Sequence, residues 1–280
     1  MSHRCLRSLS YFVLALSVAA LPAGAAELLF PKALHLTRRV HDSIGGATTV
    51  VEQYCYGNRV ITVSGNVTTI TDYDKSEITE INRADATYSI SRFDQIAKAL
   101  HPASLPAASL SSSKKSWELR NVGRAGALSA RSTDIFEADR SDPEMTRHVR
   151  IGIDSSVALS KDALAVITGS AFPASPKEED TAIATAAKRH APAVASQSTG
   201  GSNGAAAESY GLPVEQVYRF EAEGQQAEVR DVVVRVGEEV PPADLVAVPP
   251  GAKLVESRLI RTTRMLDSID RLPLDGLKTQ

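Results

Sequence analysis

The carboxylates of Asp72 and Asp74 stand two residues apart, a spacing that puts two side chains on the same face of a β-strand. Such a pair could hold a metal-bound nucleotide, as the two-carboxylate motif of some transferases does. A simpler interpretation is favoured, because Asp74-Lys75 has the composition of a turn, in which an Asp side chain bonds to nearby backbone groups. We therefore expect a turn at this position.

Two other segments carry groups that could act as nucleophiles. Ser111-Ser112-Ser113-Lys114 matches the Ser-x-x-Lys of serine acyltransferases, but it lies in a Ser-rich stretch and no Lys-Thr-Gly partner motif is present. Cys55 lies between Tyr54 and Tyr56 with no histidine near it in sequence, whereas a reactive thiol needs a neighbouring base or cation. We expect Cys55 to be buried and inert, and we expect no catalytic residues.

Histidine is the remaining candidate for metal binding. Five histidines lie beyond the first 25 residues: His35, His41, His101, His148 and His190. The first two could share a strand face, but six residues at about 3.3 Å each would separate them by about 20 Å. This is too far for one metal ion, so we expect solvated surface histidines, no metal site and no cofactor.

The first 25 residues have the layout of a secretory signal peptide. Arg4 and Arg7 precede an apolar stretch of 11 residues, Tyr11 to Leu21, and then the small residues Ala23-Gly24-Ala25. A membrane-spanning helix needs roughly 20 apolar residues, so this stretch is too short. We expect cleavage after Ala25 or Ala26 and a periplasmic protein with no transmembrane span; the alternative is an uncleaved anchor.

The composition excludes several classes of protein. Lys and Arg number 31 and Asp and Glu number 33, a net charge of −2 that gives no electrostatic reason for nucleic-acid binding. One of the two cysteines, Cys5, lies in the signal segment, so the exported chain would have no intramolecular disulfide. The hydrophobic fraction of 43% is ordinary for a globular protein, and aromatic residues make up 5%.

The chain is dominated by strand patterns. Between Ala33 and Ser91, short runs rich in Val, Ile, Thr and Tyr alternate with turn signals such as Gly57-Asn58 and Gly65-Asn66, which predicts an antiparallel meander. Ser91 is a good N-cap for a helix that follows it. Further strands are expected near residues 117–121, 132–138, 149–153, 163–172, 214–220 and 229–236. The fold class is therefore mainly β (α+β).

Three segments interrupt or follow this pattern. Residues 101–116 and 173–210 are low-complexity insertions rich in Ala, Ser and Pro or Gly, and much of that composition does not repay its ordering entropy. Apolar residues at spacings of three and four from Lys253 to Asp270 predict an amphipathic helix. We therefore expect a single domain over residues 26–253 and a C-terminal helix and tail over residues 254–280.

Several turns and strand pairs carry a resemblance to a known family. They are Gly57-Asn58-Arg59, Ile70 to Lys75, Ile81-Asn82 with Thr87-Tyr88, Gly211-Leu212-Pro213 and Val248-Pro249-Pro250-Gly251. In this order they resemble an uncharacterised family of exported bacterial domains, similar to the periplasmic carriers and outer-membrane receptors of lipoprotein sorting (LolA/LolB-like). The resemblance covers about Ala33 to Lys253. It implies a curved antiparallel sheet or half-barrel with helices covering its concave face.

The resemblance implies that acyl chains bind in the concavity of the sheet, as they do in the carrier relatives. Alternation along the strands makes one set of side chains candidates for lining it: Tyr54, Tyr88, Ile90, Trp117, Tyr218 and Phe220. Their other interpretation is packing against the covering helices. The function expected is a non-catalytic periplasmic protein that holds a lipid or a lipoprotein acyl chain. The alternative is an envelope protein-interaction module that uses its C-terminal helix and polar insertion to contact a partner.

Overall fold

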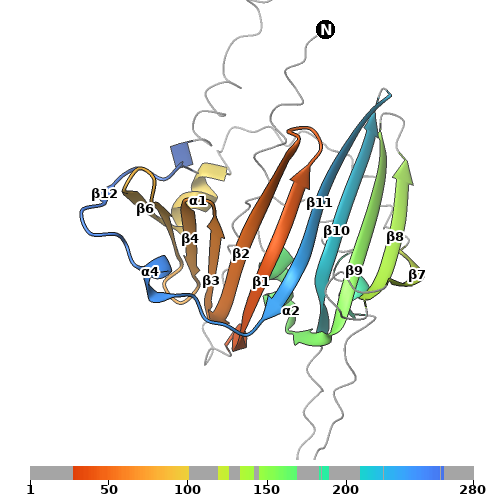
Figure 1. Cartoon of the computed structure of the whole chain (residues 1–280), viewed down its shortest axis with the longest axis horizontal. Coiled ribbons are helices and arrows are strands. Elements are labelled where there is room, and N and C mark those ends of the chain that lie inside the picture. The colour runs from red at the N-terminus through yellow and green to blue at the C-terminus, as the bar shows by residue number, and fades with distance from the viewer. Residues whose placement is uncertain are drawn as a thin grey trace, which may run out of the picture.

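Backbone pairing joins the strands that the structure describes into one sheet (Figure 1). The structure is a computed structural model, which describes residues 28–100, 119–125, 133–141, 145–168, 183, 185–188, 209–222, 224–258 and 260–261. The strands are β1 (Phe30–Asp42), β2 (Ala47–Gly57), β3 (Arg59–Ser64), β4 (Val67–Asp72), β5 (Glu77–Asn82), β6 (Thr87–Arg92), β7 (Arg120–Ala125), β8 (Thr133–Ser141), β9 (Thr146–Leu159), β10 (Tyr210–Ala222), β11 (Gln225–Gly237) and β12 (Lys253–Leu254).

The order of the 12 strands is β12-β6-β5-β4-β3-β2-β1-β11-β10-β9-β8-β7, so among the described strands β12 and β7 are the two edges and the sheet is open. Neighbouring strands are antiparallel, except that β12 pairs with β6 in parallel. The prediction of a mainly β protein built on an antiparallel sheet is confirmed. Trp117, expected at the start of a strand, lies outside the described residues, and β7 begins at Arg120.

Local turns produce the meander from β1 to β6. At the turn between β4 and β5, Asp72 Oδ1 accepts a hydrogen bond of 3.1 Å from the backbone N–H of Lys75, while Asn58 Nδ2 donates to Asp74 Oδ1 at 2.7 Å. The two carboxylates are thus used in turn bonding, which confirms the turn prediction. Gly57 has a φ of 55°, a left-handed conformation that glycine adopts without steric cost.

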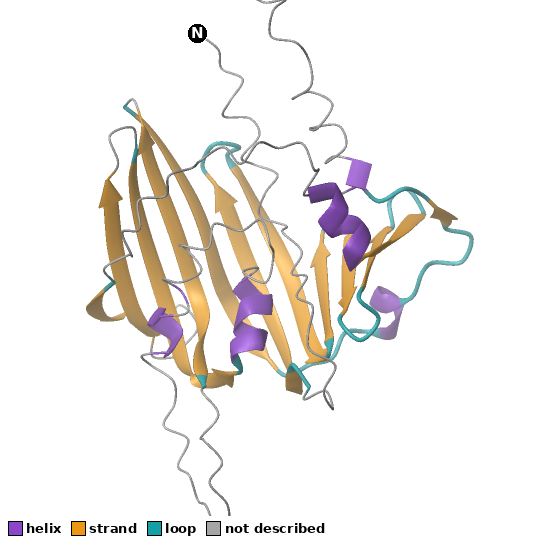
Figure 2. Cartoon of the chain, turned by 180° about the vertical axis from the view of Figure 1, so that it is seen from behind, coloured by secondary structure: helices purple, strands orange, loops and turns teal. Residues whose placement is uncertain are grey.

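Helices α1 (Phe93–Leu100) and α2 (Lys161–Thr168) lie on the same side of the sheet, which we call the helix face (Figure 2). The helix predicted after Ser91 is confirmed by α1, but Ser91 is not its N-cap, because Ser91 is a buried residue within β6 and α1 begins at Phe93. The strand predicted over residues 163–172 is wrong, because α2 occupies its first half. Ser160 Oγ caps α2 by accepting a 3.1 Å bond from the N–H of Ala163, and its apolar residues follow helical spacing.

The main hydrophobic core lies on the helix face. Strand residues of alternate position meet the apolar side of α1 and α2, and the core contains Leu34, Leu36, Cys55, Val60, Ile78, Phe136, Val149, Ile151, Ile153, Leu212, Val214 and Val233 from the sheet. One ion pair lies among them. Arg38 donates to both carboxylate oxygens of Asp231, at 3.1 and 2.5 Å, and it also donates to Ile167 O at 3.3 Å. This last bond ties the end of α2 to β1.

A connecting segment crosses the opposite side of the sheet, which we call the strap face. The segment Glu238–Ala252, here named the strap, leaves β11, carries the single turn α4 (Ala243–Val246) in front of β4, and reaches β12 beside β6 (Figure 1). At about 4.8 Å per strand, the seven steps from β11 to β12 amount to about 34 Å. Pro241, Pro242, Pro249 and Pro250 lack the N–H that strand pairing requires, so the strap cannot join the sheet.

The C-terminal helix begins later than the sequence predicts. Lys253 and Leu254 form β12 instead of opening a helix, and beyond them helical structure is described only at residues 258, 260 and 261, where the N–H of Arg261 donates to Ser257 O. The remainder of the predicted helix and both low-complexity centres lie outside the described residues. Within the described ranges, none of the helices has the length and apolar character needed to cross a membrane.

Burial raises the pKa of the Cys55 thiol from an ordinary 9.0 to about 12. We expect the Cys55 peptide to stay unlabelled when the native protein is treated with iodoacetamide at about pH 8, because the neutral thiol is a poor nucleophile. In 8 M urea the same thiol should react fully, as peptide mapping by mass spectrometry would record. Full labelling of the folded protein would contradict this burial.

Candidate functional site

The strand register places five of the six predicted ligand-lining residues, and they lie on two different faces of the sheet. Tyr54 pairs with Ile61 and continues through Ile70 and Thr79 to Ile90, so these side chains share the strap face. Tyr88 lies two residues from Ile90 and therefore on the same face. Tyr218 and Phe220 lie on the helix face instead, with Tyr218 packed against the core, and Trp117 lies outside the described residues. One concavity therefore cannot be lined by both groups.

An apolar stripe runs along the strap face towards the β6 edge of the sheet. Its inner members, Ile61 and Ile81, are 0% exposed, and α4 of the strap packs against β4 between them. Its outer members are uncovered, since Ile90 is 50% exposed and Leu254 is 64% exposed. Leu254 is the register partner of half-buried Tyr88. We call Tyr88, Ile90 and Leu254 the edge patch.

Specific backbone contacts hold the strap over this stripe. Arg83, in the turn between β5 and β6, donates to the carbonyl oxygens of Asp244 and Leu245 at 2.5 and 3.0 Å. At the far end, the N–H of Lys253 donates to Ala86 O at 2.9 Å, and the N–H of Val255 donates to Tyr88 O at 2.8 Å. The strap therefore ends by adding a short strand to the edge of the sheet.

A buried histidine lies near the start of the strap, where β11 ends. His35 is 6% exposed and stacks on Tyr54, with ring centroids 4.1 Å apart and planes 7° apart. Its Nε2 is 2.6 Å from Glu52 Oε2, and its Nδ1 is 3.1 Å from Glu239 Oε2. Thr37 Oγ1 also donates to Glu52 Oε2 at 2.8 Å. The expectation that the histidines are solvated surface residues is wrong for His35.

The charges of this cluster affect the groups around it. A hydrogen bond from its own backbone N–H, followed by the bond with His35, lowers the pKa of Glu239. Burial, followed by the negative charges of Glu52 and Glu239, raises the pKa of the Tyr54 hydroxyl, and Arg235 works in the opposite direction. No local pattern in the sequence indicates this cluster, because Glu52 and Glu239 are 17 and 204 residues from His35.

The other half of the strap face carries a ladder of ion pairs. Glu215 is 3% exposed and accepts from Arg150 Nε at 3.3 Å and from Arg230 Nη2 at 3.1 Å, and Arg150 also donates to Glu137 at 2.7 Å. Burial opposes the charge of Arg150, but its bonds with Glu137 and Glu215 outweigh this and raise its pKa. Gly152 leaves room for this arrangement, since a Cβ there would lie 3.1 Å from that of Glu215.

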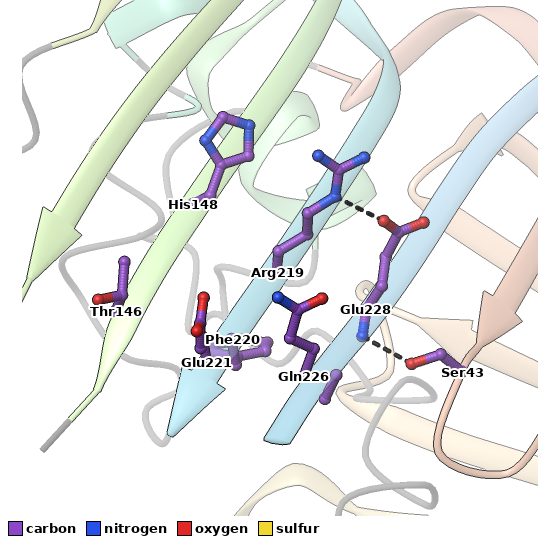
Figure 3. Close-up of a pocket in the computed structure, with 9 residues that line it drawn as sticks. Ser43, Thr146, His148, Arg219, Phe220, Glu221, Gln226 and Glu228 are labelled. Atoms are coloured by element: carbon purple, nitrogen blue, oxygen red, sulfur yellow. Dashed lines mark hydrogen bonds and ion pairs between the residues drawn. The ribbon is translucent and has the colours of Figure 1, made fainter. Parts of the chain in front are cut away.

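A polar hollow of about 570 Å³ lies where the β1–β2 turn meets the ends of β9, β10 and β11 (Figure 3). Its lining residues are Ser43, Thr146, His148, Arg219, Phe220, Glu221, Gln226, Ala227 and Glu228. Arg219 donates to Glu228 at 2.6 Å, and His148 lies 2.7 Å from an oxygen of Asp139. Arg219 and His148 therefore already have carboxylate partners. Phe220 is the one predicted lining residue that reaches this hollow.

Among the described side chains, no group of three or more His, Cys, Asp and Glu residues is arranged to hold a metal ion.

No family model and no curated protein matches the chain. One similar solved structure, described as "Structure of PNGF-II in C2 space group", has a TM-score of 0.33 and 9% identity. The match covers 83% of this chain and 33% of that chain. The chain thus spans about a third of that structure's chain, and a TM-score of this size supports no inference about fold or function.

The buried carboxylate of Glu215 is expected to matter more for stability than its exposed neighbours. Glu215→Gln should lower the free energy of unfolding by about 1–3 kcal/mol, because two guanidinium groups lose their shared anion. Glu228→Gln, which breaks the exposed pair with Arg219, should cost about 0–1 kcal/mol. Urea unfolding of the two variants measures the difference, and equal costs would contradict this assignment.

Proposed function

We propose that this protein is an exported, non-catalytic binding protein of the bacterial envelope, and that it binds an extended segment of another envelope protein at the edge patch. The observation that carries the proposal is the exposure of Ile90 and Leu254 beside Tyr88 at the edge of the sheet. Natural proteins commonly protect sheet edges with charge, proline or a covering segment, and apolar groups left exposed at an edge indicate an interaction site.

The way the strap ends supports an extended partner. β12 contributes two residues to the edge, and the N–H groups of Lys253 and of Val255, which follows β12, bond to the carbonyl groups of Ala86 and Tyr88 along the outward side of the edge. The edge is therefore already used for strand addition by the protein itself. Ile90 lies two residues further along β6, beyond the register partners of β12. A partner strand that continues this addition would place an apolar side chain over Ile90 and Leu254.

A photoreactive residue at position 90 tests this proposal in cells of the source organism. We expect crosslinks to one defined envelope protein, and no such product from position 122, because Val122 is equally exposed at the opposite edge of the sheet. The purified partner should then bind Ile90→Glu or Leu254→Glu at least about tenfold more weakly than the unaltered protein.

Both variants change exposed residues, so their unfolding midpoints should stay close to that of the unaltered protein. Crosslinks of the same kind from positions 90 and 122, or unchanged affinity of the two variants, would count against the edge patch as the binding site.

A second candidate function is the binding of an acyl chain on the helix face, in line with the lipoprotein carriers that the sequence resembles. Its specific support is the half-buried pair Tyr218 and Phe220, which alternate along the end of β10, with Phe220 beside the polar hollow. An acyl chain lying along these rings would follow the helix face at the end of β10.

Native mass spectrometry of protein purified from the periplasm tests this second candidate. A bound acyl chain should add a defined mass that organic extraction removes, and Phe220→Glu should lose it while Ile90→Glu, on the other face, keeps it. An empty protein that takes up no fatty-acid probe would exclude acyl-chain binding. The mass also reports whether residues 1–25 or 1–26 have been removed.

A further inference from the structure

The imidazole of His35 makes contact with a carboxylate at each of its two nitrogens. Glu52, on β2, lies 2.6 Å from Nε2, and Glu239, on the strap, lies 3.1 Å from Nδ1. A neutral imidazole carries one N–H and one lone pair, whereas the protonated ring carries two N–H groups. Both contacts can therefore be hydrogen bonds to ionised carboxylates only when the ring is charged.

The groups around His35 determine which of its two hydrogen bonds is lost when the imidazole is neutral. The charged or titratable groups facing His35 are Glu52 and Tyr54 on β2, Arg235 on β11 and Glu239 on the strap. The shorter contact, with Glu52, is reinforced by the hydroxyl of Thr37. A neutral ring that keeps its proton on Nε2 turns the Nδ1 lone pair towards the carboxylate of Glu239. That side chain is 48% exposed, so water can solvate the carboxylate once its bond with the ring is lost.

The path of the strap over Gly237 makes this contact possible. Gly237 is the register partner of His35 on β11. A Cβ at Gly237 would lie 1.9 Å from Glu239 Oε2, so the carboxylate occupies the space that any other residue would fill. Glu239 thus folds back over the last residue of β11 to reach the ring, and Arg235 binds its second oxygen.

We infer that the contact between His35 and Glu239 is a proton-operated latch that fastens the strap at acidic pH and loosens it as the pH rises. The direction of this pH dependence follows from the hydrogen bonding of His35. A charged ring attracts the carboxylate of Glu239, whereas a neutral ring presents a lone pair to it. Histidine is the side chain whose charge ordinarily changes between about pH 5 and 8. Loosening at this end weakens the strap whose other end covers β6, so the latch governs how much of that edge is open.

Hydrogen exchange of the full chain tests the latch independently of any partner. The readout is the protection factor of the amides of Lys253 and Val255, corrected for the intrinsic exchange rate at each pH. Between about pH 5.5 and 8, we expect this factor to fall about two- to fivefold, a size typical of a partly exposed ion pair. Amides in β4 and β5 report on the sheet itself and should keep their protection.

Two variants make the test specific. Glu239→Gln changes an exposed side chain, and its amide can donate to the neutral ring, so strap protection at about pH 8 should rise and lose its pH dependence. His148→Gln is the matched control, because His148 pairs with Asp139 on the same face but away from the strap. It should leave the pH dependence unchanged.

Strap protection that does not change with pH in the unaltered protein would overturn the latch, as would a Glu239→Gln variant with unchanged pH dependence. Failure of the edge patch to bind a partner would leave these exchange results standing, so the two proposals can fail separately.

Discussion

Register along β1 is the constraint on which the rest of the structure depends. β1 pairs with β2 on one side and with β11 on the other, and the pairing with β11 shifts between Thr37 and Arg38, where β11 contains one extra residue, Val234. Because side chains alternate between the two faces of a sheet, the extra residue moves each later side chain of β11 to the opposite face from the one it would otherwise occupy. It turns Gly237 to the face of His35 while leaving Val233 in the core of the helix face.

The sheet also has to bury apolar side chains on both faces over part of its width. In β3, the consecutive residues Val60 and Ile61 are both buried, the first in the helix-face core and the second on the strap face. A strand covered on both sides has no polar face left. The strap supplies the second cover with backbone that cannot pair as a strand, and it protects the middle of the apolar stripe more completely than its end at β6.

Features that depend on neighbouring residues could be predicted from the sequence. The turn at Asp72 to Lys75 follows from local bonding preferences, and the helix after Ser91 follows from the helical spacing of its apolar residues; both are present. The short run after Ser160 is predicted to be a strand, because apolar β-branched residues fit a buried strand and a buried helix equally well. The cap at Ser160 favours the helix that the structure shows.

Features that depend on pairing between distant residues could not be predicted. Alternation shows which residues share a face within one strand, but it does not show which faces of two separate strands coincide. The candidate residues Tyr54 and Tyr218 are therefore correctly spaced within their strands and yet lie on opposite sides of the sheet. His35 was expected at the surface for the same reason, because its two carboxylate partners come from β2 and the strap.

The position of β1 between β2 and β11 has a consequence for how the chain acquires its structure. β1 to β6 can pair as soon as they are made, whereas the outer side of β1 waits for β11 and the outer side of β6 waits for β12. Until residues 225–254 follow, the early meander has two unpaired edges that can bind each other in neighbouring chains. Premature pairing between the open edges of nascent molecules is therefore a hazard of this topology, and it ends only when the last segment of the chain has been added.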